Sequence, residues 1–449
     1  MRHTQAANSI AASISNLPSP FTLHPSPFTL HPSPFTLHAP TFSATLSPVN
    51  TPITFSVPHA ARVRFQALPP LSLYVHVPWC VRKCPYCDFN SHELRGELPE
   101  QQYVRALLAD LEQALPSIWG RRIHTVFFGG GTPSLLSARA LDDLLSGIRA
   151  RVALDPAAEI TLEANPGTFE ADKFAEFRHI GINRLSIGIQ SFNARHLRAL
   201  GRIHDERQAR RAVQIAQECF DNVNLDLMYA LPEQTSLEAE ADLAAAIDFG
   251  PQHLSVYQLT IEPNTRFARF PPPVPTEDIA ADMQEVLESM LAQSGYAHYE
   301  TSAFAQAGRS SQHNLNYWRF GDYLGIGAGA HSKLSFAELV VRQARCKHPR
   351  EYLERAAAGQ ALHTEHEVEA SELPFEFMMN ALRLTEGFET SLFQERTGLP
   401  LAAALRPLEE AERRGLVHRD HLRVAPTRTG QRFLNDLLQL FLRDGAVKD

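Results

Sequence analysis

Cysteine is scarce in this sequence, with five cysteines in 449 residues. So few thiols exclude a framework of disulfide bonds and fit a reducing compartment. No apolar run reaches the roughly 18 residues or more of a membrane span. The formal net charge is -8 and the arginines are scattered, so the sequence lacks the basic run that nucleic-acid binding favours. We therefore expect a cytoplasmic protein with no transmembrane segment and no nucleic-acid partner.

Acidic residues are missing from about the first seventy positions, which are rich in Pro, Ser and Thr. The heptad Pro-Ser-Pro-Phe-Thr-Leu-His occurs there in three tandem copies that start at Pro18, Pro25 and Pro32. Because frequent proline removes backbone donors and blocks helices, we expect residues 1–66 to form a disordered, dispensable extension. A targeting peptide is the alternative, although arginine is sparse for an amphipathic presequence.

From Leu71 onward, short apolar stretches alternate with amphipathic helical patterns six times. This alternation predicts an α/β core with a parallel sheet over residues 67–300. Periodicity alone leaves open whether the sheet is doubly wound or curved into part of a barrel. The predicted strands are Ser72–Val77, Thr125–Phe128, Glu159–Ala164, Arg184–Ile189, Val223–Met228 and His253–Leu259, and the predicted helices are Gln101–Leu115, Ala138–Val152, Glu170–His179, Arg207–Cys219, Leu237–Asp248 and Glu277–Gln293.

The pattern changes after about residue 295, where Tyr296–Phe304 predicts one further strand. We expect residues 301–370, with the Gly-rich stretch Gly321–His331, to be a region that connects two domains. Helical runs around a short strand-like piece predict a mostly helical, winged-helix-like domain over residues 371–449. Since that segment lacks a basic surface, an interaction or lid role is favoured over DNA binding.

Three cysteines, Cys80, Cys84 and Cys87, follow the first predicted strand with C-x3-C-x2-C spacing. A zinc site usually takes four ligands in C-x2-C pairs, whereas an iron–sulfur cube is able to take three thiolates and leave one iron open. A disulfide with a spare thiol, or an incomplete zinc site, is the alternative. We expect these three cysteines, and not Cys219 or Cys346, to hold a [4Fe–4S] cluster.

Later strands end in glycine or polar side chains. Gly129-Gly-Gly-Thr-Pro133 follows the second strand, where a backbone without side chains is able to approach a ligand and present free N–H groups; a tight turn is the alternative. Asp226 lies in an otherwise apolar strand, and a buried carboxylate is costly unless it is paired or ligand-bound. These positions predict a binding site at the carboxyl ends of the strands.

The cysteine spacing, with Tyr86 directly before the third cysteine, resembles the radical S-adenosylmethionine (radical SAM) superfamily. The resemblance implies a partial (β/α)6 barrel with its chemistry at the carboxyl ends of the strands. It also implies that the open iron of the cluster chelates the amino and carboxylate groups of S-adenosylmethionine, which one electron then cleaves to a 5′-deoxyadenosyl radical.

Further stretches resemble one branch of this superfamily, the HemN and HemW proteins. The resemblance runs nearly continuously from about Leu71 to the C-terminus. Among them are Tyr74-Val-His-Val-Pro-Trp-Cys80, Phe128-Gly-Gly-Gly-Thr-Pro133, Glu163-Ala-Asn-Pro166 and Leu200-Gly-Arg202-Ile-His204. The branch resemblance implies that the following residues line the S-adenosylmethionine site: Tyr74, Tyr86, Gly130, Gly131, Thr132, Glu163, Gln190, Arg202 and Asp226.

Two features favour the HemW heme chaperone family over HemN, the oxygen-independent coproporphyrinogen III oxidase. HemN carries a further cysteine where this chain has Phe89, and the stretch His313-Asn-Leu-Asn-Tyr-Trp318 (HNxxYW) is typical of HemW. The resemblance implies binding of heme, with His313 contributing, and its delivery to client hemoproteins, membrane-associated cytochromes among them. Porphyrinogen decarboxylation is the alternative, a monomer and a homodimer both stay open, and His204 or His331 is an alternative heme ligand.

Overall fold

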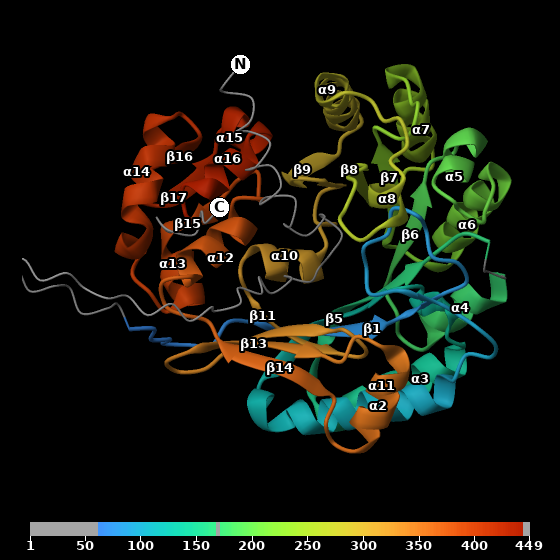
Figure 1. The fold of residues 1–449 in the computed structure, drawn as a ribbon, viewed down its shortest axis with the longest axis horizontal. Helices are drawn as coiled ribbons and strands as arrows, with labels where there is room; N and C mark the ends of the chain where they lie inside the picture. The colour runs from blue at the N-terminus through green and yellow to red at the C-terminus, as the bar shows by residue number, and fades with distance from the viewer. Residues whose placement is uncertain (1–61, 168–170, 443–449) are drawn as a thin grey trace, which may run out of the picture.

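In the computed structural model, which describes residues 62–167 and 171–442, a parallel sheet organises the chain (Figure 1). Its strands are buried on both faces, because helices cover the outside and side chains fill the interior. Each predicted strand of the core is present, as expected for the partial (β/α)6 barrel. In spatial order these strands are β1 (Leu71–Val77), β4 (Arg122–Gly130), β5 (Ala153–Ala164), β6 (Arg184–Gln190), β7 (Val223–Tyr229) and β8 (His253–Gln258).

The crossover helices begin where the sequence supplies caps. Ser137 caps α3, and Asp205 and Thr235 form capping boxes at the starts of α6 and α7. The apolar faces of these helices pack on the sheet, which places the strand ends and their loops at one rim. The helices are α2 (Glu100–Ala114), α3 (Ala138–Arg151), α4 (Ala171–His179), α5 (Ala194–Ala199), α6 (Glu206–Cys219), α7 (Ser236–Asp248) and α9 (Glu277–Gln293), with the short α8 (Arg266–Arg269) before the last.

Residues 301–370 do not form a connecting region, contrary to our expectation. Strand β11 (Asp322–Ile326) pairs in parallel with β1, so that β1 lies between β4 and β11. Strands β12 (His331–Ser335), β13 (Val340–Arg345) and β14 (Leu362–Glu367) then extend the same sheet in antiparallel order. The Gly-rich stretch hides this strand, because its glycines allow the close backbone packing that pattern analysis interprets as a loop.

The other edge of the sheet is a hairpin. The single strand predicted over Tyr296–Phe304 is broken into β9 (Ala297–Glu300) and β10 (Ala303–Ala305), which pair with each other. Strand β10 also pairs antiparallel with β8. The short helix α10 (Gln312–Trp318) follows and lies against β1, β4 and β11.

The C-terminal region is mostly helical, as predicted, and has its own core. Phe377 packs edge-on against Phe388 and Phe393, with ring centroids 4.9 and 5.0 Å apart. Its helices are α12 (Leu373–Ala381), α13 (Thr390–Thr397), α14 (Leu405–Arg413), α15 (Arg428–Arg432) and α16 (Leu434–Gln439), beside a small sheet of β15 (Phe388–Glu389), β16 (Val417–Arg419) and β17 (Arg423–Pro426).

The packed chain begins earlier than Ala67. Val63 belongs to the C-terminal core, the backbone N–H of Arg64 donates to Gly398, and that of Phe65 donates to Ala337. Residues 62–66 therefore belong to the fold, which corrects the boundary expected at residue 66. Apolar Val63 and Phe65 carry too weak a pattern to reveal this packing. The rest of the expected extension lies outside the described residues.

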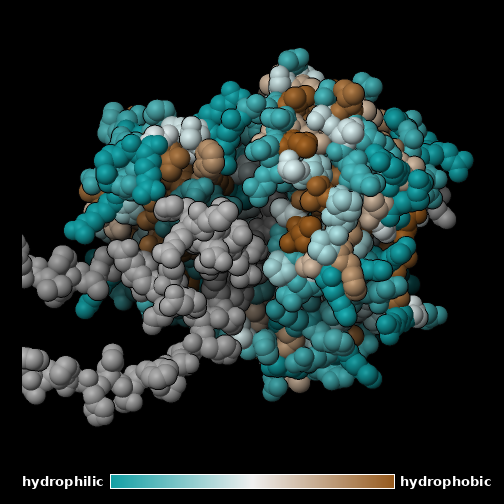
Figure 2. Space-filling model, turned by 45° about the horizontal axis from the view of Figure 1, so that its top comes forward, coloured by the Kyte–Doolittle hydropathy of each residue, from teal (hydrophilic) through white to brown (hydrophobic). Residues whose placement is uncertain are grey.

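The surface in Figure 2 is largely hydrophilic, with separate rather than contiguous hydrophobic patches on the barrel side. Within the described ranges, no helix is long and apolar enough to cross a membrane.

Candidate functional site

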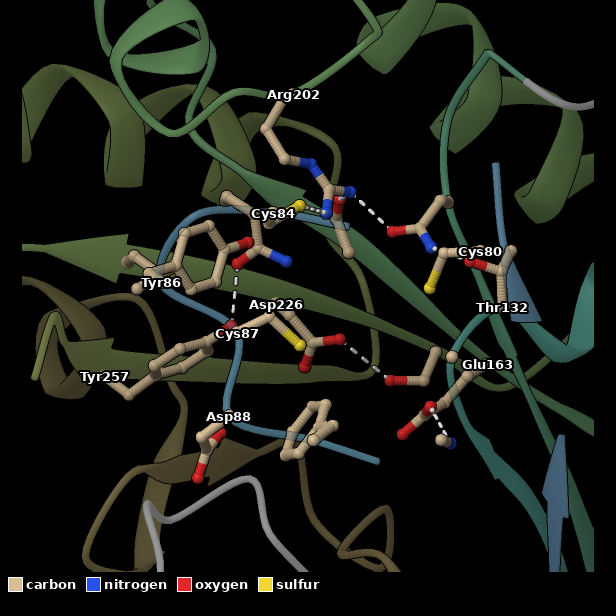
Figure 3. A pocket seen from close by; sticks show the side chains of 18 of the residues that line it. Cys80, Cys84, Tyr86, Cys87, Asp88, Thr132, Glu163, Arg202, Asp226 and Tyr257 are labelled. Atoms are coloured by element: carbon tan, nitrogen blue, oxygen red, sulfur yellow. Dashed lines mark hydrogen bonds between the residues drawn. The ribbon is translucent and has the colours of Figure 1, made fainter. Parts of the chain in front are cut away.

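The three clustered cysteines line one cavity at the carboxyl ends of the barrel strands (Figure 3). Cys80 ends the short strand β2 (Trp79–Cys80), which pairs with β3 (His92–Glu93), and the backbone N–H of Cys87 donates to the Cys84 carbonyl. Burial raises the pKa of the Cys80 thiol to about 12 and also raises that of Cys87. Such thiols stay protonated unless a metal centre binds them as thiolates. Cys219, on α6, and Cys346, after β13, lie outside this cavity.

The cysteine loop is held by two sets of backbone contacts. Nζ of Lys83 donates to the carbonyls of Phe89 and Ser91, and both hydrogen bonds are 3.1 Å long. Asn90 donates through Nδ2 to the carbonyls of Ala328 and Lys347, over 2.9 and 2.8 Å. The segments that follow β11 and β13 therefore hold the loop in place.

The glycine loop after β4 does not present free N–H groups, which corrects our expectation. The amide of Gly130 donates to Oε2 of Glu163, that of Gly131 to Val77 and that of Thr132 to the Trp79 carbonyl. A Cβ on Gly131 would lie 2.5 Å from the carbonyl oxygen of Trp79. Glycine is required here because the turn packs directly on the cysteine loop. The three residues still line the cavity, where Thr132 accepts from Nδ2 of Asn165.

Two carboxylates form one wall of the cavity. Glu163 is the last residue but one of β5. Asp226 of β7 accepts hydrogen bonds from Ser186 and from Nδ2 of Asn224, at distances of 3.1 and 2.8 Å. Burial, reinforced by the charge of Asp226, raises the pKa of Glu163 to about 8, and burial also raises the pKa of Asp226. A cationic amino group or sugar hydroxyls would satisfy this pair.

Arg202 faces the same cavity from the loop after α5. Its Nη2 donates to Oδ1 of Asn165 over 2.5 Å and to the carbonyl of Gly188 over 2.6 Å, and its Nη1 lies 3.7 Å from Sγ of Cys84. Its buried Nε makes no hydrogen bond to the described residues. Arg202 therefore does not form the surface ion pair that is common for arginine. Its guanidinium is held on the side of the cavity where the cysteines lie.

Gln190 marks a strained strand end. Its φ of 67° is left-handed, and the pairing of β6 with β7 shifts register between Gly188 and Gln190. Its Oε1 accepts a 2.7 Å hydrogen bond from the hydroxyl of Tyr257. Sequence reasoning missed Tyr257 and Asn165 as lining residues, although both lie at strand ends, where polar side chains gather.

Of the two predicted tyrosines, only Tyr86 lines the cavity, where it packs near Phe267. Tyr74 lies in β1 beneath the glycine loop, with its hydroxyl 3.0 Å from Nδ1 of His76. It therefore supports the loop from inside the barrel.

His313 lies apart from this cavity, on α10, and its side chain is fully buried. Its Nδ1 lies 2.7 Å from the hydroxyl of Thr125, and its ring stacks on Phe127 at 5.0 Å. Burial lowers the pKa of His313 to about 3, so the imidazole is neutral. The two alternative histidines also have lowered pKa values, and His204 lies beside Arg202 while His331 begins β12.

Four residues of the HNxxYW stretch each carry a buried polar atom without a hydrogen-bond partner among the described residues. These atoms are Nε2 of His313, Oδ1 of Asn314, the hydroxyl of Tyr317 and Nε1 of Trp318. Buried polar atoms are rarely left unpaired in proteins, and here four of them are concentrated on one short helix. An imidazole with one nitrogen hydrogen-bonded and the other free also has the form of a metal ligand.

A chain of hydrogen bonds joins α10 to Asp226 through the barrel interior. Oδ1 of Asn224 lies 2.6 Å from Nδ1 of His253, and Nε2 of His253 lies 2.8 Å from the hydroxyl of Tyr299. That hydroxyl accepts the backbone N–H of Ser311, the N-cap of α10. Because Asn224 also donates to Asp226, the position of the carboxylate depends on this chain.

Comparisons with known proteins agree with this geometry. Residues 74–246 match the Radical SAM superfamily, and residues 368–433 match the HemN C-terminal domain. A solved structure of coproporphyrinogen III oxidase (HemN) from Escherichia coli, described as a radical SAM enzyme, is similar with a TM-score of 0.72 at 25% identity, covering 83% of this chain and 90% of that one.

Relatives in sequence are more similar still. The heme chaperone HemW of Escherichia coli (strain K12) is 50% identical over 382 residues, which cover 84% of this chain and 99% of that protein. The heme chaperone HemW of Bacillus subtilis (strain 168) is 33% identical over 83% of this chain and 99% of that protein. The cysteine spacing, the cavity and the HNxxYW helix thus occur in a chain that belongs to the HemW family of the radical SAM superfamily.

Proposed function

We propose that this protein is a heme chaperone that binds a [4Fe–4S] cluster, S-adenosylmethionine and heme, and delivers heme to client hemoproteins. The name of its relatives supports the proposal, and the two separate sites give it a physical basis. One site is the cysteine cavity and the other is the HNxxYW helix. We further propose that it works in the cytoplasm, because its three clustered thiols must stay reduced to bind a cluster.

The donor set of the cavity fits the cluster and the cofactor. Cys80, Cys84 and Cys87 would ligate three irons, and the bound cluster supplies one-electron chemistry to S-adenosylmethionine. Glu163 would accept hydrogen bonds from the amino group or the ribose of that cofactor. Arg202 would pair with its carboxylate, because its Nε is free and its other nitrogens are held in place.

The unpaired polar atoms on α10 carry the proposal of a heme site. Nε2 of His313 offers the axial ligand, and Tyr317 and Trp318 offer aromatic surface and hydrogen bonds. Because the imidazole is fully buried, heme reaches it only after α10 shifts away from β4. The hydrogen-bond chain from Ser311 to Asp226 would transmit such a shift to the cofactor cavity.

Anaerobic heme titration with and without reconstituted cluster tests this function. We expect His313→Ala to weaken heme binding and to move the Soret band, while His331→Ala and His204→Ala serve as comparisons with unchanged cluster content. Wild-type heme binding by His313→Ala together with loss in His331→Ala would move the ligand to the Gly-rich stretch.

The similarity to the HemN structure makes coproporphyrinogen III oxidation the second candidate. Phe89 lines the cavity at the position where HemN carries a further cysteine. Incubation of the reconstituted protein with coproporphyrinogen III should give no protoporphyrinogen IX, and formation of this product would favour the oxidase. A protein that holds a cluster but forms no 5′-deoxyadenosine under reducing conditions would be a structural member of the superfamily.

A further inference from the structure

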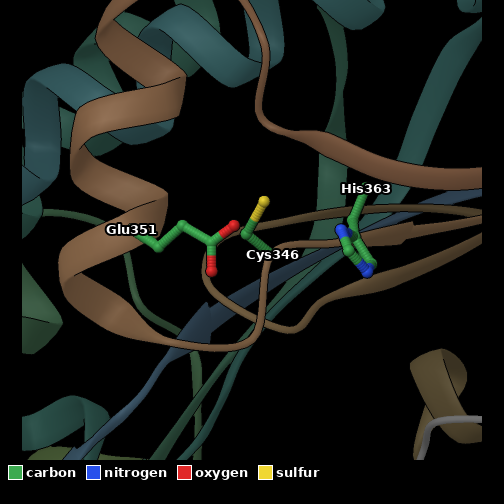
Figure 4. A group of neighbouring side chains, drawn as sticks. All are labelled: Cys346, Glu351 and His363. Atoms are coloured by element: carbon green, nitrogen blue, oxygen red, sulfur yellow. The ribbon is translucent and has the colours of Figure 1, made fainter.

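A second group of metal-ligating side chains lies away from the cavity. Cys346, Glu351 and His363 each offer one ligand atom, and these atoms all lie within 4.8 Å of one another (Figure 4). None of the three lines the cavity that holds Cys80, Cys84 and Cys87. The proposed heme chaperone function gives them no role.

The fold brings these residues together on rigid elements. Cys346 directly follows β13, and its backbone N–H donates to Ala361, just before β14. His363 lies on β14 where the pairing with β13 shifts register, between the paired residues Leu362 and Thr364, and Glu351 lies in the first turn of α11 (Pro349–Ala357). The backbone around each ligand is therefore held by strand pairing or by a helix start.

Access to the group is open on one side. Cys346 is buried, whereas Glu351 and His363 are exposed, and Figure 4 shows the carboxylate of Glu351 on one side of the cysteine and the ring of His363 on the other. A cation would approach from solvent and keep a water as its fourth ligand. The carboxylate of Glu351 lies 3.4 Å from Arg355, in an exposed ion pair that yields readily to a cation.

We propose that Cys346, Glu351 and His363 bind a divalent transition metal, with Zn²⁺ as the best match. A thiolate with an imidazole and a carboxylate suits zinc, whereas magnesium and calcium prefer oxygen ligands alone. Metal–sulfur distances of about 2.3 Å and metal–nitrogen or metal–oxygen distances of about 2.0–2.1 Å place ligand atoms roughly 3.3–3.6 Å apart. Side-chain rotation of the exposed Glu351 and His363 supplies the small closure that this requires.

The metal would tie β13, β14 and α11 to one another. Helix α11 packs on α2, so the site would stiffen the sheet edge that carries the support for the cysteine loop. Its expected effect is a higher melting temperature with Zn²⁺, because a ligand that binds only the folded state stabilises it.

Titration with Co²⁺ as a spectroscopic probe tests the site in the full chain, after the cluster cysteines have been filled by reconstitution. We expect one Co²⁺ per chain with a thiolate-to-cobalt charge-transfer band. Cys346→Ser should abolish the band, and His363→Gln should weaken Co²⁺ binding by at least about tenfold. Cys219→Ser is the matched control and should bind like wild type.

His363→Gln and Glu351→Gln keep the test falsifiable, because both residues are exposed and substitutions at exposed positions usually change stability little. Absence of the charge-transfer band in the wild type would overturn the proposal. Equal Co²⁺ affinity in His363→Gln and wild type would overturn it as well, even if Cys346→Ser unfolds.

Discussion

The affinity for S-adenosylmethionine should rise with pH, because Glu163 has to be ionised to bind a cationic amino group. Its pKa is raised to about 8 by burial and by Asp226. If only the ionised form binds, the dissociation constant carries a factor of 1 + 10^(pKa − pH), which is about 100 at pH 6 and about 4 at pH 7.5. The dissociation constant should therefore fall about 25-fold over this window.

The raised pKa of Glu163 also determines how the free energy of unfolding changes with pH. The unfolded chain loses this proton near the ordinary pKa of 4.5, whereas the folded chain keeps it up to about 8. The folded state thus binds more protons between these values, so its contribution to the free energy of unfolding decreases as pH rises through the window. Cofactor binding should offset this decrease, since it supplies the ionised carboxylate with a partner.

Equilibrium dialysis of anaerobic, cluster-loaded protein measures the effect. The pH is kept at 7.5 or below so that the cofactor's own α-amino group, for which the ordinary pKa is about 7.7–8.0, stays mostly protonated. Glu163→Gln should bind weakly at every pH, and Asp226→Asn should move the rise to lower pH by removing the neighbouring charge. A flat wild-type profile at constant iron content, or the same rise in Glu163→Gln, would refute the reasoning.

Three further outcomes are expected. Cys84→Ala should lose the iron–sulfur absorbance and Cys219→Ala should keep about four irons per chain, and equal behaviour of the two variants would contradict the assignment. A chain that lacks residues 1–61 should hold the cluster and bind S-adenosylmethionine. In contrast, Val63→Ala should lower the free energy of unfolding by about 1–2 kcal/mol in a denaturant titration. An unchanged midpoint of this titration would place Val63 outside the core. Asn224→Leu should lower the free energy of unfolding by about 1–3 kcal/mol and weaken the binding of S-adenosylmethionine, because the carboxylate of Asp226 loses a buried hydrogen-bond donor. Unchanged affinity would mean that the hydrogen-bond chain from α10 to Asp226 has only a structural role.

The sequence predicted the strands and helices of the core and the cysteine site because these rest on local signals, whereas the choice of a barrel came from the family resemblance. Apolar strands of the core are short and separated by capped helices, and Cys80, Cys84 and Cys87 lie within one loop. Asp226 was found by the rule that a polar group in an apolar strand needs a partner, whereas Glu163 was implied by the family resemblance.

Features that depend on tertiary contacts were beyond sequence reasoning. The amides of Gly131 and Thr132 were expected to be free, yet they pair with the carbonyls of Val77 and Trp79, which only the folded chain brings near. The same holds for β11, whose partner β1 lies far away in the chain, and for Val63, whose partners are in the C-terminal core.

The place of β11 beside β1 also bears on the order in which the protein is made and matured. Leu71 pairs with Asp322, and Asn90 in the cysteine loop is held by the carbonyl of Lys347. During synthesis these partners leave the ribosome long after the cysteines, and pairings so distant in sequence form slowly. Iron delivered to the nascent chain would meet three thiols in an unsupported loop, so cluster assembly should follow release of the chain.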